Sequence, residues 1–316
     1  MATEVVSTVR TSGGDYSTLG AWEAGEQTNL VTADEIAVAE IQGSIGMDYS
    51  GFELNGWTTD ATHYCQIRAE SGYKYDFVND TGAKLTETTG TFGFVIRSGN
   101  RLHLTDLSLF IDNNTSYGLA YSTGDFIKIE RCYCESVRFW ADASDFHSSI
   151  FVIDPTASSN AYLRQGNTSD STAFNCVVVN KNASYTNPIC YNETTAKNCI
   201  AYHASSGGIY APYYLCSGNY NTQNDATASA PPGANSDRDF VSSDFEDYAN
   251  GDYHLDSASG YNTSGRNLYD EGDLSSPFYD FDGDEMPASG TAWPMGADFV
   301  AAGGGITGNL AAQETG

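Results

Sequence analysis

A short pattern of apolar and polar positions recurs between Leu102 and Thr222. Each copy has a small or apolar residue, usually a polar residue two places on, and then Cys or Leu. The copies occupy 104–109, 129–134, 173–178, 196–201 and 213–218. Their fourth positions are 107, 132, 176, 199 and 216, so the spacings are 25, 44, 23 and 17 residues. The spacing of 44 corresponds to two repeats, because the apolar segment 149–154 lies in the gap.

The repeat predicts short parallel strands. None of the apolar runs is long enough for a helix. Leu104 and Leu107 are three apart, so a straight strand would put them on opposite faces. A corner between them lets both face the core, and Asp106, Asn175 and Asn198 at this corner tolerate a left-handed backbone. An antiparallel sandwich is the alternative, but it does not predict a column of cysteines.

The predicted fold is therefore all-β, a parallel β-helix in which equivalent side chains form ladders. We expect an N-terminal cap at 1–34, the β-helix at 35–222 and an irregular C-terminal capping or attachment region at 223–316. The first strands of the β-helix are expected at 35–41, 64–69 and 92–97. A polar excursion at 72–90 separates the last two, and such excursions usually carry function.

The N-terminal cap is expected to contain a strand at 5–9 and a short helix that covers the open edge of the first coil. Leu19 and Trp22 are three apart and share one face of this helix. Ser17 or Thr18 can cap its start, and Gly25 can end it.

Both ends of the chain resemble bacterial and phage β-helix proteins. The stretch 13–25 resembles the opening of many right-handed, pectate-lyase-like β-helices. Four C-terminal stretches resemble their closing signature, with Met286 where Arg is usual and Met295 where Ile is common. These stretches are 251–256, 275–278, 280–284 and 293–298. The resemblance implies a right-handed parallel β-helix.

Three N-terminal stretches, 15–24, 30–40 and 56–61, look like β-helix proteins from tailed bacteriophages. That resemblance implies a virion protein on the particle surface without assigned catalytic residues. We expect a non-enzymatic capsid decoration protein, attached to the major capsid protein or the tail, that forms oligomers, with trimers favoured. It could also bind a host-surface glycan. The alternatives are a tail spike with depolymerase activity and a cytoplasmic scaffold.

The charge limits the range of partners. The chain has 14 Lys and Arg against 41 Asp and Glu, a net charge of −27. Such a surface repels nucleic acid and polyanionic glycans unless a cation intervenes. The first residues have neither a basic region nor an apolar stretch, so no signal peptide is expected, and no run is long enough to span a membrane.

The seven cysteines are open to two interpretations. Six of them lie in or beside the predicted strands, at 132, 134, 176, 190, 199 and 216. One interpretation is a disulfide framework, and the other is a column of buried free thiols that act as small apolar residues. We favour free thiols. A zinc site is not supported, because Cys132 and Cys134 lack a second pair of ligands.

Candidate metal ligands occur near the C-terminus. Asp280, Asp282 and Asp284 alternate around Gly283 and could bind calcium, which prefers several oxygen ligands. The spacing differs from that of the EF-hand loop, so a solvated or capped polar turn is the alternative. No cofactor is required by either interpretation.

Candidate catalytic residues are few. A glycosidase needs two carboxylates and a lyase needs a base. If the chain is an enzyme, Glu130, Glu135 and Asp142 are the carboxylates to test, with further charges nearby at Lys128, Arg131, Arg138, Asp145 and His147. The alternative is that these charges lie on solvated strand faces.

Aromatic residues at the edges of the repeats are candidates for contact with a glycan or a partner. They are Tyr117, Tyr121, Trp140, Tyr210 and Tyr213, with Phe139 and Tyr214 beside them. Packing within the protein is the other interpretation of the same residues.

Overall fold

The computed structural model describes most of the chain. The described residues are 2–47, 52–87, 92–96, 99–111, 117–119, 126–135, 139–141, 143–153, 163–165, 171–181, 190–191, 195–204, 213–214, 216–224, 231, 233, 235–237, 239–274, 277–287 and 290–297. Within them the structure consists mainly of β-strands with a few short helices.

Three parallel sheets contain nearly all of the strands. The first sheet has nine: β1 (Thr3–Val9), β2 (Glu35–Ile41), β5 (Cys65–Ala69), β8 (Arg101–Thr105), β11 (Phe126–Glu130), β14 (Ala143–His147), β17 (Thr172–Phe174), β20 (Thr195–Lys197) and β23 (Ser217–Asn219). The second has eight: β3 (Ser44–Gly46), β6 (Lys84–Glu87), β9 (Ser108–Ile111), β12 (Tyr133–Glu135), β15 (Ile150–Ile153), β18 (Val177–Asn180), β21 (Ile200–His203) and β24 (Thr222–Gln223). The third has seven: β4 (Phe52–Leu54), β7 (Phe92–Ile96), β10 (Tyr117–Leu119), β13 (Phe139–Ala141), β16 (Leu163–Gln165), β19 (Cys190–Tyr191) and β22 (Tyr213–Tyr214).

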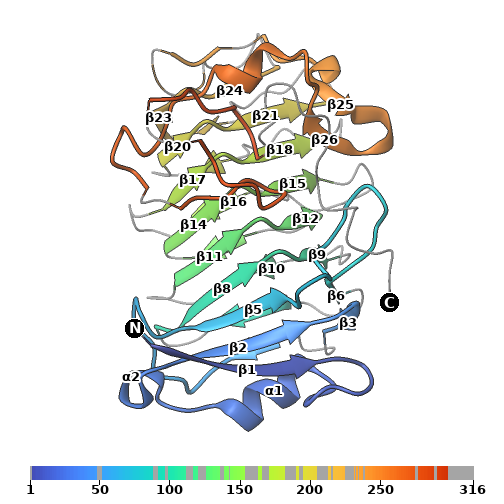
Figure 1. The fold of residues 1–316 in the computed structure, drawn as a ribbon, viewed down its shortest axis with the longest axis vertical. Coiled ribbons are helices and arrows are strands. Elements are labelled where there is room, and N and C mark those ends of the chain that lie inside the picture. The colour runs from blue at the N-terminus through green and yellow to red at the C-terminus, as the bar shows by residue number, and fades with distance from the viewer. Residues whose placement is uncertain are drawn as a thin grey trace.

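The chain passes through the three sheets in rotation. After β8 in the first sheet come β9 in the second, β10 in the third and β11 back in the first. Each return places the new strand parallel to the previous one, as where Leu102 pairs with Cys65 on one side and Ile127 on the other. The strands of the first sheet therefore stack along the long axis of the molecule (Figure 1). The prediction of parallel strands is confirmed.

The predicted corner is present between the first and second sheets. Asp106, Asn175 and Asn198 have φ values of 61°, 51° and 56°, which confirms the left-handed backbone. Leu104 and Leu107 on either side of the corner are both fully buried. The corner allows two positions three residues apart to face one core, as the sequence pattern requires.

Three further residues take the same left-handed conformation at this corner. They are Arg131, Ser148 and Tyr220, with φ values of 51°, 44° and 57°. We call the six residues at this corner, from Asp106 to Tyr220, the corner strip. A left-handed conformation costs a residue with a Cβ atom roughly 1 kcal/mol, and Asn tolerates it best. Backbone geometry therefore does not explain the Arg at 131.

The register of the last repeat differs from the prediction. Ile200 pairs with Thr222, so Asn221, and not Cys216, lies beside Cys199. The Asn221 Oδ1 accepts a hydrogen bond from the Cys199 amide at 3.0 Å. The prediction that Cys216 occupies the fourth position of the last repeat was wrong, because it followed residue type. The step from Cys199 to Asn221 is 22 residues, which keeps the period of the repeat.

The cysteine column is formed by free thiols. The six described cysteines, at 65, 132, 134, 176, 199 and 216, are all free, and all but Cys216 are buried. Ser149 occupies the column between Cys132 and Cys176, and its Oγ accepts a hydrogen bond from the Cys132 amide at 3.1 Å. Burial raises the pKa of the Cys132 thiol to about 12, so it behaves as a small apolar side chain. The side chain of Cys190 lies outside the described residues.

The N-terminal cap contains the predicted helix. Helix α1 (Leu19–Glu26) is followed by α2 (Leu30–Ala33), and the Thr18 hydroxyl accepts a hydrogen bond from the Ala21 amide at 3.1 Å. Leu19 and Trp22 are buried, as expected. The predicted helix end at Gly25 is wrong, since the helix continues to Glu26. The predicted strand in the cap is β1, and it pairs with β2 as the first strand of the first sheet.

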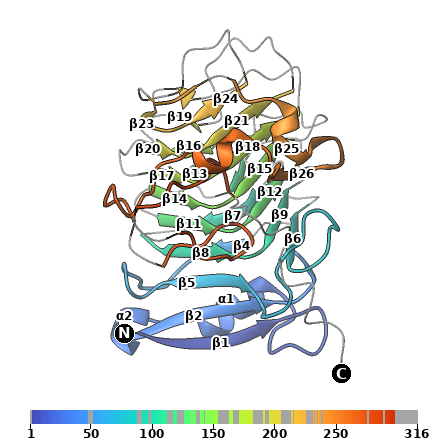
Figure 2. The same ribbon diagram turned by 45° about the horizontal axis from the view of Figure 1, so that its top comes forward.

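A C-terminal segment, residues 239–274, 277–287 and 290–297, packs along the outward side of the second sheet and, through Phe278 and Trp293, against Phe174 of the first sheet (Figures 1 and 2). It contains the antiparallel pair β25 (Phe245–Asp247) and β26 (Asp252–Leu255) and three short 3-10 helices, η1 (Ser242–Asp244), η2 (Tyr248–Asn250) and η3 (Gly260–Thr263). Its buried aromatic residues contact outward-facing residues of the sheet such as Val177 and Ile200. Burial of these apolar surfaces attaches the segment to the sheets.

The corner strip also binds this segment through side chains. The Ser148 hydroxyl donates to the Tyr279 carbonyl at 2.7 Å, and the Asn175 amide donates to the Pro294 carbonyl at 3.2 Å. The Asn198 side chain donates to the Arg266 carbonyl at 2.7 Å and accepts from the Arg266 amide at 2.8 Å. The neutral half of the corner strip is therefore occupied by backbone groups of the C-terminal segment.

Among the described residues, the helices are all too short or too polar to cross a membrane.

Candidate functional site

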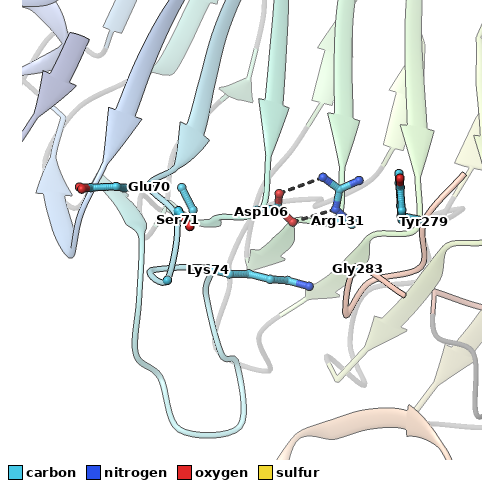
Figure 3. Close-up of a pocket in the computed structure, with 9 residues that line it drawn as sticks. Glu70, Ser71, Lys74, Asp106, Arg131, Tyr279 and Gly283 are labelled. Carbon is cyan, nitrogen blue, oxygen red and sulfur yellow. Dashed lines mark hydrogen bonds and ion pairs between the residues drawn. The ribbon is translucent and has the colours of Figure 1, made fainter. Parts of the chain in front are cut away.

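A polar cleft lies at the charged end of the corner strip, beside Tyr279 and Gly283 of the C-terminal segment (Figure 3). Its volume is about 510 Å³. Its lining comes from four parts of the chain, namely the loop after β5, the corners after β8 and β11, and the C-terminal segment. The lining residues are Ala69, Glu70, Ser71, Gly72, Lys74, Asp106, Arg131, Tyr279 and Gly283. We call it the corner cleft.

Arg131 is at the centre of the polar groups in the corner cleft. Its Nε and Nη2 donate to the two carboxylate oxygens of Asp106 at 2.8 and 2.9 Å (Figure 3). Its Nη1 donates to Glu130 Oε1 at 2.9 Å, and Lys128 Nζ lies 2.6 Å from the other oxygen of Glu130. The guanidinium also lies over the ring of Tyr279, 5.6 Å from the ring centroid. These contacts form a chain of alternating charges that fixes the guanidinium.

The alternating charges around the corner cleft keep both Glu130 and Arg131 ionised. Burial works to raise the pKa of Glu130, but the charges of Lys128 and Arg131 outweigh it, so the pKa is lowered. Burial works to lower the pKa of Arg131, but Asp106 and Glu130 outweigh it, so the pKa is raised. At neutral pH the site therefore carries ions rather than a protonated acid or a neutral base.

Lys74 connects the loop after β5 to the C-terminal segment. Its ammonium donates to the Phe281 carbonyl and lies 5.0 Å from the centroid of the Phe281 ring. Burial lowers the pKa of Lys74, and the nearby carboxylates of Asp282 and Asp106 partly counteract this. Figure 3 shows the side chain running along the cleft toward Gly283. Lys74 therefore closes one side of the cleft.

Glu70 lines the side of the corner cleft opposite Tyr279 (Figure 3). Both of its carboxylate oxygens accept hydrogen bonds from Arg10 Nη2, at 2.7 and 2.6 Å. Arg10 follows β1 and Glu70 follows β5, so this pair spans the end of β2, which lies between these two strands in the first sheet. Ser71 and Gly72, which come next, are exposed in the cleft.

The predicted catalytic carboxylates do not form a pair in the described structure. Glu130 lies in β11 of the first sheet, with Lys128 and Arg131 as partners. Glu135 lies in β12 of the second sheet, where its Oε2 accepts a hydrogen bond from the hydroxyl of Tyr133 at 3.3 Å. Asp142 lies outside the described residues.

The predicted aromatic contact residues are only partly described. Tyr117, Trp140 and Tyr213 lie in β10, β13 and β22, so the third sheet brings their backbones onto one side of the molecule. Nothing is described of their side chains, and Tyr121 and Tyr210 lie outside the described residues. Their role in contacts stays a prediction.

The acidic turn near the C-terminus is a capped turn. The Asp280 Oδ1 accepts a hydrogen bond from the Asp284 amide at 2.8 Å, and Gly283 takes a φ of 88°. Asp282 Oδ2 lies 3.5 Å from His254 Nε2. No group of three or more potential metal ligands occurs in the part of the chain that the structure describes. Calcium binding by Asp280, Asp282 and Asp284 stays a prediction.

Sequence reasoning found Arg131 only as one of several lateral charges and missed Lys74, Glu70 and Tyr279. The polar excursion predicted at 72–90 was a usable signal, because the loop after β5 supplies four of the nine lining residues, and Gly72 and Lys74 lie in the excursion. No local signal marks Tyr279, since it reaches the cleft through the fold of the C-terminal segment.

The sequence matches no protein-family model and no curated protein.

Proposed function

We propose that this chain is a non-enzymatic surface protein of a bacteriophage virion and that it binds a glycan in the corner cleft. We further propose that its three parallel sheets form a right-handed parallel β-helix. The passage of the chain through the sheets in rotation supports the β-helix. Right-handed crossovers are strongly preferred between parallel strands, which supports the handedness.

The observation that carries the binding proposal is the ion pairing in the corner cleft. A glycosidase needs a carboxylic acid that keeps its proton, together with a second carboxylate. Glu130 has a lowered pKa, and both of its oxygens contact cations. Arg131 has a raised pKa, which disfavours the neutral form that a lyase base requires. The two carboxylates that line the cleft, Asp106 and Glu70, are likewise paired with Arg131 and Arg10, so the cleft is better suited to bind a sugar than to cleave one.

The virion proposal rests on the sequence. The resemblance of the N-terminal stretches 15–24, 30–40 and 56–61 to phage β-helix proteins supports it. The net charge of −27 suits a protein that functions without nucleic acid. The proposed place is the capsid surface, with the major capsid protein or the tail as partner and trimers as the favoured assembly. An elongated acidic chain presents little apolar surface to a single partner, which favours oligomers.

Binding without cleavage tests the biochemical part of the proposal. We expect the purified protein to bind host-surface polysaccharide and to release neither reducing ends nor unsaturated sugars from it. Product release that disappears in Glu130→Gln, with the fold retained by circular dichroism, would instead establish a tail-spike depolymerase. The control is Glu135→Gln, which changes a carboxylate of the second sheet and should leave such product release unchanged.

A further inference from the structure

We infer that the corner cleft selects uncharged glycans over acidic ones, an inference that rests on the glycan-binding function proposed above. The first reason is that the charges of the cleft are already matched. Arg131 is bound to Asp106 and Glu130, and Glu70 is bound to Arg10. The other cation that lines the cleft is Lys74, which donates to the Phe281 carbonyl.

An acidic sugar would have to replace one of these contacts. The side chain of Arg131 is 14% exposed and that of Asp106 is 26% exposed, so both are partly removed from water. Displacing Asp106 from Arg131 would leave a half-buried carboxylate without its partner, which is costly. The field of a chain with a net charge of −27 opposes the same ligand at longer range.

A neutral sugar needs no such displacement. A guanidinium has five N–H donors, and three are used in the hydrogen bonds to Asp106 and Glu130. Each Asp106 oxygen accepts one of these bonds and has a further lone pair. Neighbouring hydroxyls of a sugar can therefore accept from Arg131 and donate to Asp106 while the ion pair stays intact. This is the donor and acceptor pattern that a hydroxyl pair requires.

The remaining lining fits the same ligand. The ring of Tyr279 borders the guanidinium, and the loop at Ser71 and Gly72 borders the cleft on the opposite side (Figure 3). Aromatic rings contact the apolar faces of sugar rings, and neutral sugars present such faces next to their hydroxyls. Ser71 is exposed and forms part of no ion pair in the described structure, so it can be changed without breaking the charge network.

The test compares two panels of soluble polysaccharides by isothermal titration. The neutral probes are dextran, mannan and galactan, and the acidic probes are alginate and polygalacturonate. We expect binding to at least one neutral probe, with an affinity that changes less than about twofold between 50 and 500 mM NaCl because no charge is screened. We expect each acidic probe to bind at least tenfold more weakly.

Two variants in the cleft and one control outside it locate the site. Ser71→Trp should abolish binding by filling the cleft, whereas Ser257→Trp, an exposed Ser outside the cleft lining, should bind like the original protein. Asp106→Asn should weaken binding of the neutral probe by about tenfold, because a hydrogen bond to a charged group is lost. Preferential binding of an acidic probe that Ser71→Trp abolishes would overturn the selectivity but keep the glycan-binding function. Binding of neither panel would overturn both.

Discussion

Replacing Asn198 with Ala is expected to lower the free energy of unfolding by about 3 to 4 kcal/mol. Asn198 is fully buried and has a φ of 56°. Ala loses the two hydrogen bonds to Arg266, each with a net value of about 1 kcal/mol, and the weaker bond to Asn175. It also has to adopt a left-handed backbone at a cost of about 1 to 2 kcal/mol.

Chemical denaturation measures this loss, and Asn198→Gly is the matched variant. Gly adopts the left-handed backbone without strain. The free energy of unfolding of Asn198→Gly should therefore be about 1 kcal/mol higher than that of Asn198→Ala, although both variants lack the same hydrogen bonds. In both variants the amide hydrogen of Arg266 should exchange faster with solvent. A cost below about 1 kcal/mol, with unchanged exchange at Arg266, would show that the corner strip does not hold the C-terminal segment.

A second large effect is expected from His147 in acid. The ring lies between Phe174, stacked at 5.5 Å, and Phe278, edge-on at 5.5 Å, and its Nε2 is buried without a partner among the described residues. Burial and the nearby charge of Lys128 lower the pKa of His147 to about 4, although Asp145 and Glu130 act in the opposite direction. The neutral ring is therefore the form that the folded state favours.

The sign of the pH effect follows from this pKa. Between pH 6.5 and 4 the unfolded state binds a proton at this residue and the folded state does not, so stability falls as the pH falls. A difference between 6.5 and about 4 corresponds to about 3 kcal/mol. Denaturation of the original protein across this range should show the loss, and His147→Phe, which keeps the aromatic stack, should show about 3 kcal/mol less of it. The loss that remains in the variant is expected from His103, whose pKa burial lowers to about 3.

His63 provides a control with the opposite sign. Hydrogen bonds to the carboxylates of Asp34 and Asp60 raise the pKa of His63, so its stabilising effect is present at low pH and is lost as the pH rises through that pKa. His63→Gln should therefore leave the loss of stability between pH 6.5 and 4 in place. An equal loss in His147→Phe and in the original protein would assign the acid effect to other groups.

The sequence predicted the parts of the fold that depend on local chemistry. Asn175 and Asn198 mark left-handed corners because their side chains tolerate that backbone, and Leu19 and Trp22 mark a helix face by their spacing. The prediction failed at Cys216, where residue type and spacing disagreed and spacing was the better guide. Asn221 replaces the expected Cys because its side chain hydrogen-bonds the Cys199 amide.

The corner cleft could not be predicted in the same way. Lys74 and Phe281 meet although they are 207 residues apart, and nothing in either neighbourhood signals the other. Arg131 and Asp106 are both visible in the sequence, but their pairing depends on the two corners being stacked in neighbouring coils. The position of the C-terminal segment depends on aromatic burial against the second sheet, which is a property of the assembled fold.

Imaging of purified phage particles tests whether this chain is a protein of the virion surface. Electron cryomicroscopy of particles from an infection, combined with mass spectrometry of the same preparation, would locate this chain. We expect it in the particle, as elongated density on the capsid lattice in groups with the local symmetry of a trimer. Absence of the chain from purified particles would contradict a virion role, and density confined to the tail tip would contradict capsid decoration.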